Sequence, residues 1–256
     1  MIFIVGGKGL TGSAFVRHFE KNHIEFKIIQ KENKEEFFGK NCDKLIFANG
    51  NALKYKANED PYFDFISSVK SISEYIHKIK FKQFIHLSTI DVYHDKSNLK
   101  NNSENSSIDA SKLDNYGFHK LLAENYVKKF CTNYLIFRLG GLVGTGLKKN
   151  PAFDFINPHK KVMISSNSNL NFINTNFVAK SILKIIDLGI KNDVFNLTSK
   201  NSIKISDIKK IIGQDSEYDK NGENNIQNYH INNKKIQKFI KLSSSEQAIE
   251  EYFRSI

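Results

Sequence analysis

Cysteine, proline, tryptophan and arginine are all scarce in this sequence. It contains two cysteines, three prolines, no tryptophan and three arginines among 38 basic residues. Cys42 and Cys131 lie far apart and show neither metal-binding nor redox-active spacing, so we expect reduced thiols in a cytoplasmic protein. No group of histidines, cysteines and carboxylates has zinc spacing either, and we therefore expect no metal site.

Long apolar runs are missing as well. No apolar stretch approaches the roughly 20 residues that a transmembrane helix needs, so we expect no membrane insertion. The 256 residues, 40% of them hydrophobic, are enough for one large domain with a full core, or for a domain with a small cap. The net charge of +11 comes from lysines spread along the chain. Without an aromatic-interleaved basic patch, this charge favours small anionic ligands over nucleic acid.

Apolar segments of strand length alternate with helical patterns along most of the chain. We expect strands at 1–5, 26–29, 44–48, 83–88, 133–139 and 194–197. We expect helices at 11–22, 62–80, 114–130 and 176–188. This alternation predicts an α/β fold with a doubly wound, mostly parallel sheet of Rossmann type. The polar segment 94–112 is typical of a long surface loop, and residues 198–256 suit a small helical cap.

A glycine-rich turn, Gly6-Gly7-Lys8-Gly9-Leu10-Thr11-Gly12, directly follows the first expected strand. Glycines at positions 6, 9 and 12 permit a tight turn, close approach of a pyrophosphate, and close packing of the next helix on the sheet. That helix also presents free N–H groups to an anion. The sequence therefore predicts a dinucleotide site, with these expected members: Gly6, Lys8, Gly9, Leu10, Thr11, Gly12, Lys31, Ala48 and Ser88.

The second expected strand indicates which dinucleotide binds. It ends in Gln30 and Lys31, where NAD-binding proteins carry an acidic residue. Lys8 and Lys31 together suit a 2′-phosphate, so we expect NADP(H) rather than NAD(H). Glu32 and Glu35 keep NAD(H) open, because either carboxylate could reach a ribose.

Three residues suit proton transfer. Tyr116 and Lys120 are spaced i,i+4 on an expected helix, which puts the phenol and the ammonium on one face. Thr89, with Ser88 beside it, lies at the carboxyl end of a central strand, where such sheets bind ligands. In this hypothesis Thr89 binds the substrate oxygen, Tyr116 moves a proton, and Lys120 orients the phenol and tunes its pKa.

Further residues are candidates for substrate contacts. Asp91 and His94 follow Thr89, and Lys148 and Lys149 follow the exit from the 133–139 strand, where their charge suits a diphosphate. We expect His86 to pack in the core or between strands. We expect His119 to face away from the cofactor.

Taken together, these motifs resemble the extended short-chain dehydrogenase/reductase family, in particular its NAD-dependent epimerase/dehydratase-like enzymes of nucleotide-linked sugars. LSTIDVY (87–93) is similar to the family's S-[ST]-x-x-V-Y segment. NYGFHKLLAE (115–124) is similar to its Y-x-x-x-K-x-x-x-E helix, and FRLGGLVGTGLKKNP (137–151) to its exit loop. The resemblance implies a catalytic set of Thr89, Tyr116 and Lys120. It also implies a nucleotide-sugar substrate and a homodimer formed through helices that flank the Y-x-x-x-K segment.

The sequence departs from the family pattern in two informative places. Only the 14 residues 30–43 separate the second and third expected strands, so we expect one edge strand to be missing. Sugar 4,6-dehydratases carry two acidic residues after the threonine, whereas this chain has Ile90-Asp91, which disfavours dehydration. We expect a dinucleotide-binding domain of residues 1–145 and 170–200, and a small substrate cap of residues 146–169 and 201–256.

Our leading hypothesis is NADPH-dependent reduction of a keto group on a nucleotide-linked sugar. A 4-keto-6-deoxy sugar of a surface polysaccharide pathway is the expected substrate. Two alternatives stay open. The first is an NAD-dependent epimerase of the same substrate class, and the second is a non-catalytic dinucleotide sensor on the same fold.

Overall fold

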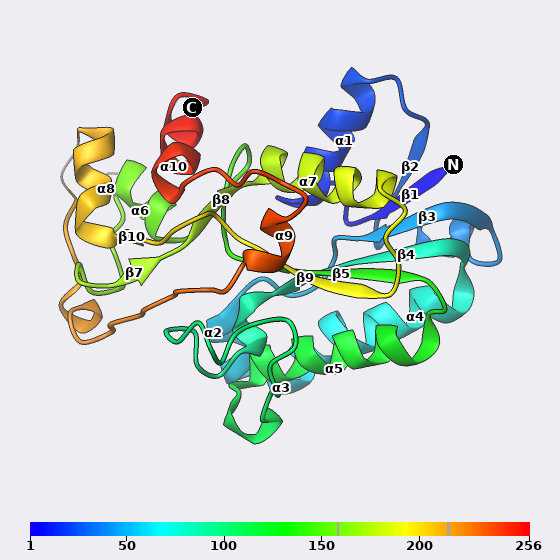
Figure 1. Ribbon diagram of the computed structural model, residues 1–256, viewed down its shortest axis with the longest axis horizontal. Helices are drawn as coiled ribbons and strands as arrows, with labels where there is room; N and C mark the ends of the chain where they lie inside the picture. The colour runs from blue at the N-terminus through cyan, green and yellow to red at the C-terminus, as the bar shows by residue number, and fades with distance from the viewer. Residues whose placement is uncertain (158, 214–215) are drawn as a thin grey trace.

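A parallel β-sheet forms the centre of the molecule (Figure 1). The computed structural model describes residues 1–157, 159–213 and 216–256. The strands of the sheet are β1 (Ile2–Val5), β2 (Phe26–Ile29), β3 (Asn41–Phe47), β4 (Lys80–Thr89), β5 (Tyr134–Leu139) and β9 (Asp193–Leu197). They lie in the order β2-β1-β3-β4-β5-β9, and every neighbouring pair is parallel. The predicted doubly wound Rossmann-type fold is confirmed.

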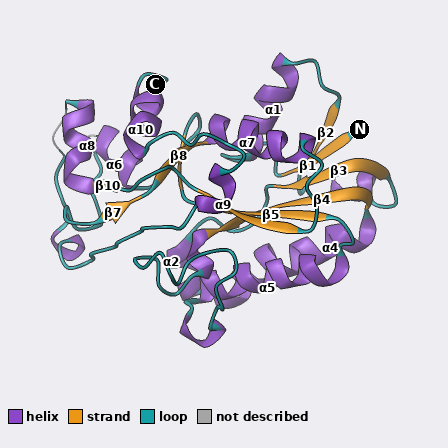
Figure 2. Cartoon of the chain, in the orientation of Figure 1, coloured by secondary structure: helices purple, strands orange, loops and turns teal. Residues whose placement is uncertain are grey.

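Helices cover both faces of this sheet (Figures 1 and 2). The helices on one face are α1 (Gly12–Lys21) and α7 (Thr175–Asp187). The other face carries α4 (Ser71–Lys78) and α5 (Asn115–Phe130), preceded by α2 (Lys54–Glu59), α3 (Pro61–Phe65) and a π-turn (Ile66–Lys70). Because alternate side chains of a strand point to opposite faces, Ile4 joins one apolar core while Phe3 and Val5 join the other.

The connection from β2 to β3 is unusually short. Residues 30–40 contain one 3₁₀ turn, Lys34–Phe37, and no strand, so β2 is the edge of the sheet. The predicted loss of an edge strand is therefore confirmed. Phe37 is buried against Phe3, with ring centroids 5.1 Å apart, and fills the space beside the short connection.

A smaller region, the cap, lies at the carboxyl ends of the strands. Its elements are β6 (Gly141–Val143), α6 (Pro151–Ile156), β7 (Asn169–Leu170), β8 (Phe172–Asn174), β10 (Ile203–Lys204), α8 (Ile205–Ile212) and α10 (Ser245–Phe253). The short helix α9 (Lys234–Gln237) instead packs on β9, and its Ile236 belongs to the core beneath α1 and α7. The domain ranges given above stay a prediction, and Pro158, Gln214 and Asp215 lie outside the described residues.

The segment 94–112 is a long loop, as expected, with one 3₁₀ turn at Ala110–Lys112. Residues 226–233, which we call the C-terminal arm, are bound to it. The fully buried amide of Asn102 donates to the carbonyl oxygen of His230 (2.7 Å) and accepts from the backbone N–H of Asn232 (2.9 Å). These hydrogen bonds therefore hold the loop and the arm together at the edge of the cap.

Candidate active site

Two adjoining cavities open at the carboxyl ends of the central strands. The first has a volume of about 600 Å³ and the second about 840 Å³, and they share the loop 49–52 and Lys149. The first pocket lies at the ends of β4 and β5, and the second lies beyond β1 and β2. The cleft thus crosses the point between β1 and β3 where the strand order reverses, which is where doubly wound sheets bind ligands.

The glycine-rich turn forms the floor of this cleft. Gly6 has φ +78°, and a Cβ there would lie 3.0 Å from the carbonyl oxygen of Ala48. A Cβ on Gly12 would overlap the carbonyl oxygen of Gly6, so no larger residue fits. The backbone N–H groups of Leu10 and Thr11 form no hydrogen bond with any described residue, and both residues line the first pocket. This cradle of free N–H groups at the start of α1 fits a pyrophosphate.

The end of β2 is neutral at the position where an acidic residue marks NAD binding. With its amide oriented to satisfy both ends, the Gln30 side-chain oxygen accepts from the backbone N–H groups of Gly7 (3.1 Å) and Lys8 (3.0 Å). Lys31 and Glu32 are exposed and line the second pocket, whereas Lys8 lines the first. The two lysines expected at one phosphate therefore lie at different pockets.

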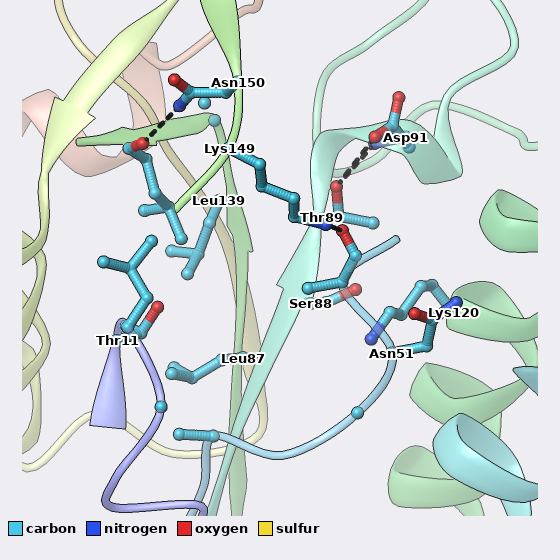
Figure 3. A pocket seen from close by; sticks show the side chains of 18 of the residues that line it. Thr11, Asn51, Leu87, Ser88, Thr89, Asp91, Lys120, Leu139, Lys149 and Asn150 are labelled. Carbon is cyan, nitrogen blue, oxygen red and sulfur yellow. Dashed lines mark hydrogen bonds between the residues drawn. The ribbon is translucent and has the colours of Figure 1, made fainter. Parts of the chain in front are cut away.

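Thr89, Tyr116 and Lys120 all line the first pocket; Figure 3 shows Thr89 and Lys120 there. Thr89 ends β4, while Tyr116 and Lys120 come from the first two turns of α5. The helix can approach the end of β4 because residue 117 is glycine, where a Cβ would overlap the carbonyl oxygen of Asp91. The Lys120 Nζ lies 5.4 Å from the centroid of the Tyr116 ring. The structure thus brings the three predicted residues together.

Burial and charge set the protonation of this pair. Burial, together with the carboxylates of Asp91, Asp64 and Asp114, raises the pKa of the Tyr116 phenol above its usual range. Burial lowers the pKa of Lys120 to about 8, against an opposing effect of the Asp64 carboxylate. Tyr116 is therefore an acid that holds its proton at neutral pH.

A buried carboxylate lies behind Lys120. Asp64 is fully buried on α3 and accepts hydrogen bonds from the side chains of Asn51 (2.9 Å) and His119 (2.8 Å). Asn51 lines the first pocket near Lys120 (Figure 3), and His119 lines neither pocket. Sequence reasoning missed Asp64, because nothing in PYFDF marks one carboxylate as buried beside a helix 55 residues away.

Asp91 is the centre of a second polar cluster. Its carboxylate is bound by Lys54 (3.1 Å), the Tyr229 hydroxyl (3.2 Å) and the Thr89 hydroxyl (3.3 Å), with Lys96 at 3.6 Å. Burial alone would raise the pKa of Asp91, but Lys54, Lys96 and Tyr229 outweigh it and lower that pKa. Lys54 and Tyr229 were not anticipated, and no sequence motif marks them.

Ser88 belongs to a buried network beneath the pocket. Its hydroxyl donates to Glu124 (2.6 Å), and Arg138 binds both oxygens of that carboxylate, the closest at 2.7 Å. Arg138 also donates to the Tyr93 hydroxyl (2.6 Å). Ser88 lines the pocket, but its hydroxyl hydrogen is donated to Glu124 within this network. The network connects α5 to β4 and β5.

The four expected substrate contacts are placed differently. Asp91, Lys148 and Lys149 line the first pocket, whereas His94 is exposed and is not among the residues that line either cavity. Lys149 donates to the carbonyl oxygen of Ala52, on the loop that the two pockets share.

A glycine cradle beside a threonine, tyrosine and lysine set is what a nicotinamide-dependent oxidoreductase of the short-chain type requires. The model of the family "NAD dependent epimerase/dehydratase" matches residues 2–158, more than half of the chain. The chain therefore belongs to that family, and the predicted NAD(P)-dependent enzyme of the short-chain dehydrogenase/reductase type is confirmed. A search of curated proteins gave no match.

Solved structures with the same fold include epimerases and reductases. A mutant of UDP-glucuronic acid 4-epimerase from Bacillus cereus, in complex with a fluorinated UDP-sugar and NAD, has a TM-score of 0.81 and 17% identity over 99% of this chain and 98% of that chain. RMD from Pseudomonas aeruginosa, complexed with NADPH, has a TM-score of 0.79 and 14% identity over 99% of both chains. The dTDP-4-dehydrorhamnose reductase from Bacillus anthracis, in complex with NADP, has a TM-score of 0.79 and 12% identity over 100% of this chain and 98% of that chain.

Two further properties concern metal and membrane. Among residues 1–157, 159–213 and 216–256, no three histidine, cysteine or acidic side chains gather where they could hold a metal ion. None of the helices in this part of the chain is long and apolar enough to cross a bilayer.

Proposed function

We propose that this protein reduces a keto group on a nucleotide-linked sugar with NADPH. The observation that carries the proposal is that Tyr116, Thr89 and Lys120 line one pocket, next to the glycine cradle. A reductase needs an acid at the start of its reaction, whereas oxidation of an alcohol needs a base. The Tyr116 phenol carries the proton that this step needs, and the nearby Lys120 ammonium favours the phenolate that is left.

The chain's own residues perform the proton half of this reaction. When bound over the glycine turn, the nicotinamide dinucleotide supplies the hydride for the carbonyl carbon. The Thr89 hydroxyl turns from Asp91 to the carbonyl oxygen, and Tyr116 transfers its proton to that oxygen. The ketone becomes an alcohol, and the Lys120 ammonium stabilises the phenolate until it regains a proton from solvent.

Lysines around the cleft support the choice of ligands. Lys31 at the second pocket suits the 2′-phosphate of NADPH, and Lys148 and Lys149 at the first suit the diphosphate of a sugar nucleotide. A 4-keto-6-deoxy sugar of a surface polysaccharide pathway is our proposed substrate. The reduced, buried thiols of Cys42 and Cys131 suit the cytoplasm, where we place the reaction.

We also propose a homodimer through the helices that flank Tyr116 and Lys120. Phe118 and Phe130 on α5 have exposed fractions of 36% and 48%, which leaves apolar surface on that helix. Sedimentation of the purified protein checks this part, since a monomer at micromolar concentration would contradict it.

The deciding experiment is a titration of the protein with NADPH and NADH by nicotinamide fluorescence, followed by turnover. We expect tighter binding of NADPH, free exchange, and stoichiometric NADPH oxidation with dTDP-4-keto-6-deoxyglucose or its UDP, GDP or CDP counterpart. No oxidation with any of these four probes would contradict the proposal.

One observation favours the NAD-dependent epimerase as a second candidate. Glu32 lines the second pocket, where its carboxylate can accept the ribose hydroxyls of NAD. An epimerase would retain its nicotinamide through gel filtration and convert a sugar nucleotide without net NADPH oxidation. A non-catalytic sensor would bind the dinucleotide and do neither.

A further inference from the structure

We infer that Tyr229, on the C-terminal arm, is a specificity-determining residue that accepts a hydrogen bond from a hydroxyl of the substrate's sugar ring. This inference rests on the proposed nucleotide-sugar substrate. It names the chemical group of that substrate that the cap recognises. The sugar hydroxyl it selects is one that lies beside the carbon held by Thr89 and Tyr116.

Tyr229 shares a pocket with the expected catalytic residues. It lines the first pocket together with Thr89, Asp91, Tyr116 and Lys120. It is the only cap residue beyond position 200 among those that line this pocket in the described part of the chain. A ligand that fills the pocket therefore contacts the C-terminal part of the cap through this side chain.

The Tyr229 hydroxyl has a fixed direction of hydrogen bonding. The Tyr229 hydroxyl has one hydrogen and donates it to Oδ1 of Asp91 at 3.2 Å. A carboxylate only accepts, so this bond fixes the phenol as the donor and leaves its oxygen lone pairs for the pocket. Burial and the charge of Asp91 raise the pKa of Tyr229, which keeps the hydrogen in place. Toward the pocket the phenol thus offers an acceptor, and a sugar hydroxyl is the matching donor.

The backbone around Tyr229 is held by hydrogen bonds on both sides. The Tyr229 N–H donates to the carbonyl oxygen of Asn169 (2.9 Å), and the His230 N–H donates to that of Lys96 (2.7 Å). The Lys96 Nζ lies 5.4 Å from the centroid of the Tyr229 ring. The ring also joins apolar clusters of both the cap and the loop side. A side chain so restrained loses little further entropy when it binds a ligand.

Binding measurements on Tyr229→Phe test the inference, because this change removes one oxygen and keeps the ring. The probes are the UDP, dTDP, GDP and CDP forms of glucose, each beside its free nucleoside diphosphate, titrated into NADP⁺-saturated protein. We expect the variant to bind the matching sugar nucleotide about 3- to 10-fold more weakly and its diphosphate equally well. Tyr62→Phe, at a side chain with 74% exposure, is the matched control.

Deoxyfluoro sugar nucleotides identify the hydroxyl, because fluorine cannot donate. For one ring position, we expect the fluorinated probe to bind the wild type and Tyr229→Phe equally. Equal affinity of both proteins for every unmodified sugar nucleotide overturns the inference, and so does an equal loss toward the free diphosphate. A wild type that binds no sugar nucleotide overturns it as well.

The outcomes separate this inference from the proposed function. The expected binding pattern without any NADPH oxidation would remove the reductase and leave the role of Tyr229 standing. If the wild type turned over a keto-sugar nucleotide and Tyr229→Phe had unchanged KM and kcat, the reductase would stand and the role of Tyr229 would be removed.

Discussion

The charged side chains of the two pockets differ in how far they are exposed to solvent. In the first, the Asp91 side chain is only 16% exposed and is bound by Lys54, Lys96 and Tyr229, and Lys120 is buried beside Tyr116. In the second, Lys31 and Glu32 are exposed to solvent. Buried charges interact strongly and are already oriented, whereas exposed ones are screened by water and salt. Changes at the first pocket should therefore alter rate, folding or the affinity for the sugar nucleotide, and changes at the second should alter dinucleotide affinity by small factors.

The largest expected effect is at Tyr116. Tyr116→Phe removes the proton donor and should lower kcat by about 10²- to 10⁴-fold while leaving NADPH affinity unchanged. Steady-state kinetics and fluorescence titration measure the two quantities, with Tyr62→Phe as the control. A variant that keeps wild-type turnover would remove Tyr116 from the reaction.

A change beneath the first pocket should affect folding instead. Glu124→Ala leaves the guanidinium of Arg138 buried without its carboxylate, which should lower the free energy of unfolding by about 3–5 kcal/mol. Denaturant unfolding measures this loss. The exposed Glu20→Ala serves as control and should change the free energy of unfolding by less than about 0.5 kcal/mol. Equal stabilities of the two variants would contradict the buried network.

The pH dependence of kcat/KM should show the titration of Lys120. Its pKa is lowered to about 8, so its ammonium is present below that pH and lost above it. We expect kcat/KM to fall above about pH 8, because the uncharged amine no longer stabilises the phenolate. Asp64→Asn removes a carboxylate that raises this pKa, and the falling limb should move to lower pH. An unmoved limb would exclude Asp64 from the electrostatics of Lys120.

The smallest expected effect is at the second pocket. Lys31→Ala should weaken NADPH binding by about two- to fivefold at low salt and leave NADH binding unchanged, because the charge is exposed. The difference should shrink as ionic strength rises. Lys27→Ala, which removes a charge from the exposed face of β2, is the control. An equal loss for NADH would contradict contact with the 2′-phosphate.

Regular patterns in the sequence predicted most of the sheet and its helices. The helix expected at 62–80 is interrupted, because its residues form α3, a π-turn at Ile66–Lys70 and α4. Ile66, Ser67 and Lys70 of that turn line the second pocket. A single inserted residue in a helical turn leaves the apolar periodicity almost intact, so the sequence pattern could not indicate it.

The sequence by itself determined the glycine turn, the strand that ends in Thr89, and the helix that carries Tyr116 and Lys120. Each depends on residues close together in the chain, whose spacing fixes one face or one turn. Only the tertiary structure decided that Lys54, Lys96 and Tyr229 meet at Asp91, and that Asp64 lies behind Lys120. These residues come from segments up to 138 positions apart, and packing of the cap and loop on the sheet, which no local spacing encodes, brings them together.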